Sequence, residues 1–176
     1  MPEAEVLEMV RYHVFLVMRL ATREIRIAGI ADQPNGAWAT QALRNLRHGL
    51  GGFLSGCRFL IHDRDPLFGT PFDQGLARSA IEGVRLPSRS PNLNAYAERF
   101  VRSIKRECLD QMVFFSENSL RYAISEFAER HHRERNHQGL GNRIIRPEFV
   151  PQPQHGRVRC RERLGGRLNY SSRQAA

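Results

Sequence analysis

The stretch that decides the fold is Phe59-Leu-Ile-His-Asp63, and 35 positions after its aspartate comes Glu98, within Asn94-Ala-Tyr-Ala-Glu-Arg-Phe100. Three consecutive apolar residues predict a buried strand that ends at Asp63, whereas 92–109 has helical periodicity and carries Glu98. Each carboxylate therefore has a rigid support. Carboxylates of this kind can share divalent ions, which activate the attacking oxygen and stabilise the leaving oxygen in a phosphodiester displacement. The pair points to chemistry on DNA.

Outward from this stretch, the first half of the chain alternates predicted strands and helices. The range 13–20 is continuously apolar and 24–30 alternates polar and apolar residues, which predicts an antiparallel hairpin. After this hairpin, periodicity and Gly or Pro breaks predict a helix over 37–46, a strand over 58–62, a helix over 70–80 and a strand over 83–86. Trp38, Ala42 and Leu46 share one helix face and are expected in the core.

The second half contains two predicted helices with clear polarity. On 92–109, one side is apolar and another side polar and basic; the apolar side has Leu93, Ala97, Phe100, Ile104 and Cys108, and the polar side has Asn94, Glu98, Arg102 and Lys105. Residues 116–119 supply an N-cap region for a last helix running toward His131, with Leu120, Ala123, Ile124 and Phe127 on its apolar face. We expect one domain over 10–150, and over 151–176 an extended or poorly ordered basic tail.

The positive charge of the chain is concentrated in its second half. The formal net charge is +9, with nine basic and nine acidic residues in 1–84 but 18 basic and nine acidic in 85–176. Arginine supplies 26 of the 27 basic side chains, and guanidinium groups bind phosphate oxygens bidentately. A compositional bias toward arginine explains the preference over lysine equally well, but it does not explain the asymmetry. The charge distribution favours a nucleic-acid partner.

The three cysteines, Cys57, Cys108 and Cys160, are widely separated and lack Cys-x-x-Cys spacing. They fit neither a disulfide framework nor a zinc site, which indicates a reducing compartment. The acidic start and the shortness of the apolar run 14–18 argue against a signal peptide or a membrane span. We therefore expect a cytoplasmic protein with no membrane partner.

The segment 59–146 resembles the integrase-type catalytic core of bacterial insertion-sequence transposases, relatives of retroviral integrases with an Asp-Asp-Glu active site. The resemblance is carried by the stretches 61–68, 91–100, 105–109 and 135–140 and by Arg146-Pro147, and it extends weakly back to Tyr12. It implies an α/β, ribonuclease-H-like fold, a mixed sheet flanked by helices, and Mg²⁺ or Mn²⁺ held by Asp63 and Glu98. Asp65 is the less favoured ligand.

The first aspartate of the family pattern falls, by this resemblance, on Arg19 in Phe15-Leu-Val-Met-Arg-Leu-Ala-Thr-Arg23. A guanidinium cannot ligate a metal ion and keeps its charge in a protein. Repulsion between unit charges about 4 Å apart is several kcal/mol at an effective dielectric constant of about 20, and a divalent ion doubles it. We expect impaired metal binding and loss of catalysis at this lost ligand position. Asp32 and Asp65 are poorly placed to substitute.

The start of the chain departs from the family as well. Transposases of this class carry an upstream helix-turn-helix region that recognises their terminal repeats, whereas here the core begins almost at Met1. A truncated or decayed copy, or a start codon that lies further upstream, accounts for this departure. Sequence-specific end recognition is expected to be missing.

By resemblance to related integrases, Arg102, Lys105 and Arg106 are candidates for contacts with DNA; the alternative is a solvated helix face in which Glu98 and Arg102 form an i,i+4 ion pair. The histidines in 131–137 lack zinc-site spacing. Three functions stay open: an integrase-type transposase core that has lost activity, a catalytically dead fragment that binds DNA or pairs with itself or an intact transposase, and a nuclease acting on RNA–DNA hybrids. The stretches 94–98 and 135–140 disfavour the third.

Overall fold

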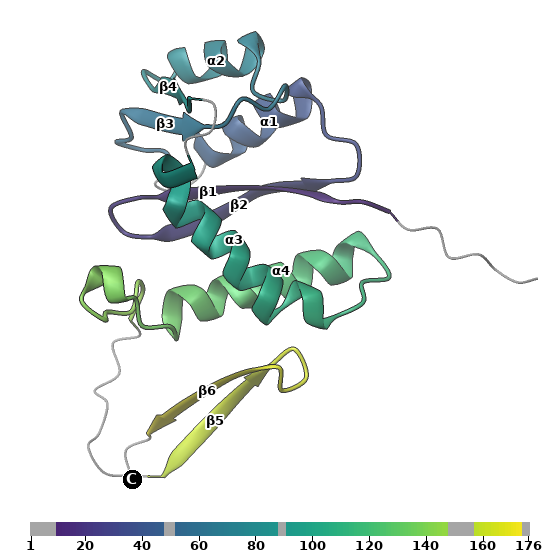
Figure 1. The fold of residues 1–176 in the computed structure, drawn as a ribbon, viewed down its shortest axis with the longest axis vertical. Helices are drawn as coiled ribbons and strands as arrows, with labels where there is room; N and C mark the ends of the chain where they lie inside the picture. Colours follow the sequence, from purple (N-terminus) through teal and green to yellow (C-terminus); the bar gives the residue numbers. More distant parts are fainter. Residues whose placement is uncertain (1–9, 48–51, 88–90, 148–156, 174–176) are drawn as a thin grey trace, which may run out of the picture. The chain divides into compact units, whose positions relative to one another are not determined.

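The structure is a computed structural model that describes residues 10–47, 52–87, 91–147 and 157–173. The chain divides into two compact units (Figure 1). Unit 1 contains the described residues up to Leu16 and from Ile27 to 87, and unit 2 contains Val17–Arg26 and the described residues from 91 onward.

Helices and short strands alternate along the chain as the periodicity predicts. Strands β1 (His13–Arg19) and β2 (Glu24–Ala31) come first, and unit 1 continues with α1 (Gly36–Arg47), β3 (Phe59–His62), α2 (Thr70–Ala77) and β4 (Glu82–Arg85). Unit 2 continues with η1 (Pro91–Asn94), α3 (Ala95–Glu107), η2 (Leu109–Gln111), α4 (Glu117–Arg133), η3 (Gln138–Leu140), β5 (Val158–Arg163) and β6 (Leu168–Arg173). The strands and helices expected from the sequence are present, with ends shifted by a few residues.

The strands pair as three two-stranded sheets, β1–β2, β3–β4 and β5–β6. Strands β3 and β4 are parallel, with Phe59 opposite Glu82 and His62 opposite Arg85. Their crossover through α2 is the connection that parallel strands need. The protein is therefore a mixed α/β protein, as expected; within the described residues the strands form no larger sheet.

The core of unit 1 is an aromatic cluster beneath α1 and α2. Phe72 is fully buried, and its ring centroid lies 4.9 Å from that of Phe68 and 6.3 Å from that of Phe15. Trp38 packs on the glycine of β2, because a Cβ atom at Gly29 would lie 2.7 Å from Trp38 Cζ2. The half-buried Trp38 thus lies on the face predicted for it.

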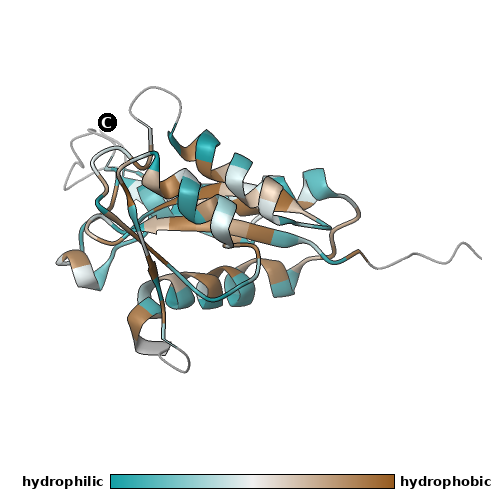
Figure 2. Cartoon of the chain, turned by 90° about the horizontal axis from the view of Figure 1, so that it is seen from above, coloured by the Kyte–Doolittle hydropathy of each residue, from teal (hydrophilic) through white to brown (hydrophobic). Residues whose placement is uncertain are grey.

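The core of unit 2 is the contact of α3 with α4. Phe100 and Phe127 are buried with ring centroids 5.8 Å apart, and Ile104 is buried beside them in α3. Ser116 caps α4 in a capping box with Ser119, as the N-cap signal predicted. The apolar side of α3 therefore faces the core, and Figure 2 shows brown and teal segments alternating along the helices.

Three expectations need correction. The strand before Asp63 was predicted to be buried throughout, but β3 buries only alternate residues: Leu60 and His62 are buried, whereas Phe59 and Ile61 are 51% and 41% exposed. Leu93 was expected on the buried side of α3, but its side chain is 56% exposed, because the helix begins only at Ala95 and Leu93 lies in the preceding η1. The C-terminal segment was expected to be extended or poorly ordered; its described part is extended, but as a paired antiparallel hairpin of β5 and β6. Backbone pairing and the burial of Leu168 stabilise this hairpin.

No helix in the described part of the chain is long and apolar enough to cross a membrane.

Candidate functional site

Asp63 lies directly after β3, at the carboxyl end of the parallel pair β3–β4 in unit 1. Ligands of open α/β sheets bind outside this edge, because the loops there present free backbone and side-chain groups. Asp63 is exposed, and its Oδ1 accepts the N–H of Asp65 at 3.2 Å. The predicted strand end therefore places this carboxylate at an accessible sheet edge.

The neighbouring Asp65 shapes the loop instead. Its Oδ1 accepts the N–H of Leu67 at 2.9 Å, and its carbonyl oxygen accepts the N–H of Phe68 at 3.0 Å. An aspartate that caps its own turn in this way is a turn-forming residue. Asp63 accepts the same kind of backbone bond, so the preference for Asp63 over Asp65 as a ligand stays a prediction.

His62, just before Asp63, is part of the core. It is buried, its ring packs edge-on to Phe68 and Phe72, and Nδ1 lies 2.9 Å from the carbonyl oxygen of Asp63. Nε2 lies 3.8 Å from Asp73 Oδ1. The packed ring therefore fixes the end of β3; that His62 is not a general base stays a prediction.

Glu98 lies in the first turn of α3, in unit 2, and is exposed. The partial positive charge of a helix N-terminus favours a carboxylate there. The i,i+4 ion pair with Arg102, which was the alternative interpretation, is not formed, and within the described residues Glu98 has no other ion pair. Its carboxylate is thus presented to solvent.

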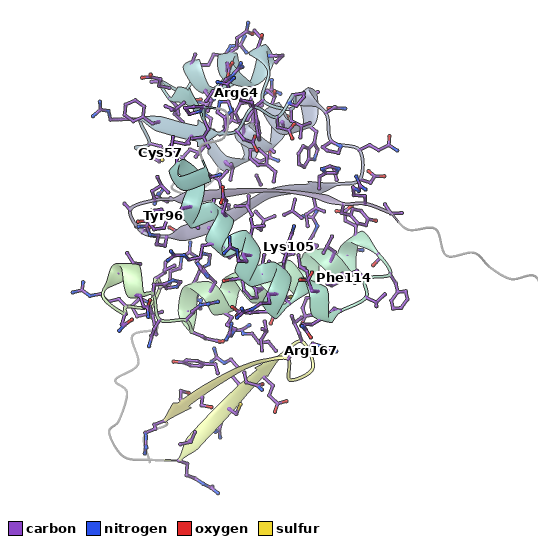
Figure 3. All side chains as sticks on the ribbon, in the orientation of Figure 1. Cys57, Arg64, Tyr96, Lys105, Phe114 and Arg167 are labelled. Atoms are coloured by element: carbon purple, nitrogen blue, oxygen red, sulfur yellow. The ribbon has the colours of Figure 1, made fainter. Side chains whose placement is uncertain are left out.

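The basic side chains Arg102, Lys105 and Arg106 follow Glu98 along α3 and are all exposed. Figure 3 shows Lys105 projecting from this helix. The opposite side of α3 is held by the core and by Glu107, which pairs with Arg130 at 3.1 Å and with Arg135 at 2.9 Å. The helix therefore presents one acid and three cations on a fixed, outward side.

Arg19 is part of an ion-pair cluster in unit 2 that the sequence did not reveal. Its guanidinium lies 3.7 Å from Glu24, and Glu24 also pairs with Arg146. Next to them, the N–H of Ile25 donates to His132 Nε2 at 2.9 Å. Glu24 and Arg146 are separated by 122 positions, so no local pattern could have linked them. The one sequence feature that singled out Arg146 was the Arg146-Pro147 stretch of the family pattern.

The histidines of 131–137 are packed together through their rings. The ring centroids of His131 and His137 are 4.5 Å apart, and His137 Nε2 donates to the carbonyl oxygen of His131 at 2.8 Å. Burial, followed by the neighbouring imidazoles, lowers the pKa of His131 to about 3; burial lowers the pKa of His132 to about 4. Both are therefore neutral at pH 7 and tie the end of α4 to its surroundings.

The acidic positions fall in different units, Asp63 in unit 1 and Glu98 in unit 2. Among the described residues there is no group of three or more His, Cys, Asp or Glu side chains that could hold a metal ion. Carboxylate oxygens are the donors that Mg²⁺ prefers, and both Asp63 and Glu98 are exposed.

An exposed acid follows a parallel strand, and a second exposed acid lies on a basic helix of this mixed α/β protein. Residues 79–144 match the family model described as an integrase core domain. This match confirms the likeness to an integrase-type catalytic core; it contains Glu98 and the basic residues of α3, whereas Arg19 and Asp63 lie outside it. No curated protein matches the chain significantly.

Proposed function

We propose that this protein is a transposase or integrase catalytic core with a ribonuclease-H-like fold over 10–150 and a basic C-terminal segment, and that its ancestral reaction is DNA strand cleavage and transfer. The observation that carries the proposal is the integrase core match over 79–144, with Glu98 exposed on α3 inside it. A cytoplasmic location, expected from the cysteine pattern, belongs to the same proposal.

Asp63 and Glu98 are proposed as the remaining catalytic acids and as ligands for Mg²⁺ or Mn²⁺. Both are exposed carboxylates, Asp63 directly after β3 and Glu98 in the first turn of α3, and carboxylate oxygens suit hard cations. Arg19, proposed at the position of the lost first ligand, is cationic and engaged with Glu24. A guanidinium repels divalent ions, so cleavage and strand transfer by this copy are proposed to be lost or strongly reduced.

Binding of DNA is proposed to persist through Arg102, Lys105 and Arg106. These side chains are exposed on one helix whose other side is fixed by Phe100 and Glu107. Positive side chains on a rigid element fix the register of phosphate groups without reading sequence. The proposed contact is therefore steep in its salt dependence and indifferent to sequence.

A second candidate function is a catalytically silent protein that occupies transposon DNA or pairs with itself or with an intact transposase. Arg19, a cation at the proposed position of the first ligand, favours it, and so does the exposed basic side of α3. Under this candidate, DNA binding is retained and no cleavage occurs with any metal ion.

The test is Mg²⁺- or Mn²⁺-dependent nicking and strand transfer on a branched DNA substrate, comparing the unaltered chain with Arg19→Asp. Asp63→Asn and Glu98→Gln in the Arg19→Asp background serve as matched controls. The lost-ligand proposal is supported if the unaltered chain has no nicking or strand-transfer activity, Arg19→Asp has activity, and both controls lose that activity. Activity in the unaltered chain contradicts it. If neither the unaltered chain nor Arg19→Asp has activity and both still bind DNA, the second candidate is favoured.

A further inference from the structure

Helices α1 and α2 of unit 1 pack closely enough to leave a shallow groove between them. A Cβ atom at Gly75 of α2 would lie 3.2 Å from Leu43 Cδ2 of α1, so a glycine is what permits this approach. The groove has a volume of about 130 Å³, and Thr40, Leu43 and Gly75 line it beside Pro71. The residues that pack the two helices thus also contribute to the lining of the groove.

Three guanidinium groups surround this groove. Arg44 and Arg47 come from successive turns of α1, Arg78 comes from the end of α2, and Gln74 completes the rim. All three arginines are exposed. Arg44 is oriented by its Nη1, which donates to Gln41 Oε1 at 3.1 Å.

Within 10–47, 52–87, 91–147 and 157–173, no carboxylate pairs with these guanidinium groups. The sequence of α1 contains no Asp or Glu, and the single acid of α2, Asp73, is engaged by Arg85 at 2.6 Å. In the described part of the chain, none of the three groove arginines forms an ion pair. The partial negative charge of a helix C-terminus offsets only part of a full positive charge. Three like charges around one groove repel each other, and an anion relieves that repulsion.

The shape of the groove decides which anion fits. The groove is small, and Leu43 and Pro71 are the largest apolar residues that line it, so it lacks the row of large apolar anchors by which peptide helices bind grooves. Guanidinium forks and a side-chain amide match the oxygens of a phosphate group. A phosphodiester, small and rich in acceptors, is the complementary ligand.

We infer that the α1–α2 groove is a phosphate-binding site that contacts the DNA backbone through Arg44, Arg47 and Arg78, separately from the basic side of α3. The inference rests on the proposed function for its ligand, DNA, and on unit 1 alone for its site. It predicts that the protein holds DNA at more than one position and that the groove contributes affinity but no sequence preference.

The experiment measures binding of a fluorescent 20-bp duplex by anisotropy between 50 and 200 mM NaCl. The groove variant changes Arg44, Arg47 and Arg78 to Gln, and the charge-matched control changes the exposed Arg11, Arg121 and Arg143 to Gln. We expect the groove variant to bind about tenfold more weakly and its log–log salt slope to be shallower by about 1 to 2. The control should change affinity less than threefold, roughly.

An equal loss in the groove variant and the control overturns the inference, because net charge then accounts for the effect. Unchanged binding in the groove variant overturns it too. Inorganic phosphate and poly-glutamate are run as competitors at constant ionic strength. If either binds the unaltered protein as tightly as DNA and loses that binding in the groove variant, DNA is not the ligand and the inference fails.

A third variant, with Arg102, Lys105 and Arg106 changed to Gln, separates this inference from the proposed function. If only the α3 variant binds DNA more weakly, the proposed function is supported and the proposed groove site is contradicted. Weaker binding by the groove variant alone supports the groove and contradicts the α3 contacts. No duplex binding by the unaltered, folded chain contradicts both; circular dichroism verifies the folding of every variant.

Discussion

Changing Arg19 to Asp tests whether this residue holds the fold together as well as occupying a proposed ligand position. Arg19 lies 3.7 Å from Glu24, and their side chains are 33% and 14% exposed. At an effective dielectric constant of about 20 the bare attraction is about 4 kcal/mol. Desolvation and solvent screening reduce it to about 1 kcal/mol, since measured partly exposed pairs have such values.

The substitution replaces this attraction by repulsion of similar size between two carboxylates, while Arg146 stays beside Glu24. We therefore expect Arg19→Asp to lower the free energy of unfolding by about 2 kcal/mol. In a domain of this size the melting temperature should fall by about 4–8 °C. The assay is urea and thermal unfolding followed by circular dichroism at low ionic strength, without divalent ions.

Arg11→Asp is the matched control, because it makes the same charge change at an exposed residue ahead of β1. Its stability should stay within about 0.5 kcal/mol of the unaltered chain. Arg19→Gln and Glu24→Gln, alone and together, should show a coupling of about 0.5–1 kcal/mol. An Arg19→Asp protein as stable as the Arg11→Asp protein would refute the ion-pair reasoning. Mg²⁺ that restores the lost stability in Arg19→Asp alone would support a metal position there.

Three further outcomes follow from packing, burial and charge. Gly29→Ala should lower the free energy of unfolding by about 1–3 kcal/mol in urea, because its Cβ would lie 2.7 Å from Trp38. The control Gly139→Ala should lower it much less, because the space around Gly139 is open. Equal losses in the two variants would contradict this packing. Burial, then the neighbouring imidazoles, lowers the pKa of His131 from 6.5 to about 3, so the unfolded chain binds a proton that the folded chain lacks, and stability should fall as pH drops below 6.5. His131→Phe should reduce that slope, and a slope unchanged in unfolding curves at pH 4–7 would refute this. Glu134→Gln removes a carboxylate that is 2% exposed and paired with two arginines of β5. Amide hydrogen exchange in the β5–β6 hairpin should therefore accelerate. Exchange rates equal to those of the unaltered chain would show that these ion pairs do not hold the hairpin.

Local patterns in the sequence predicted the elements that depend on neighbouring residues. The continuous apolar stretch before Asp63 is a strand, and the Ser116 signal is a helix cap. The side of α3 that carries Glu98 is exposed, as its periodicity predicted. Each of these features is set by residues within a few positions of one another, so the local sequence pattern is enough to predict it.

The hairpin of β5 and β6 escaped prediction because its stability comes from outside its own sequence. Its strands are rich in arginine and read as a solvated tail, yet Arg163 pairs with Glu126 and Glu134 of α4 at 2.9 and 2.8 Å. Leu168 is buried. Charge counts within a segment cannot show that distant carboxylates neutralise it.

The sequence by itself determined the order of helices and strands, the apolar sides of α3 and α4, and the exposure of Glu98 and its basic neighbours, because these follow from backbone periodicity and local capping. The tertiary structure alone decided that Arg19 pairs with Glu24, that Glu24 also meets Arg146, and that three arginines of two helices surround one groove. Such groupings join residues far apart in the chain. Their free energy depends on distance and burial, which exist only once the chain is folded.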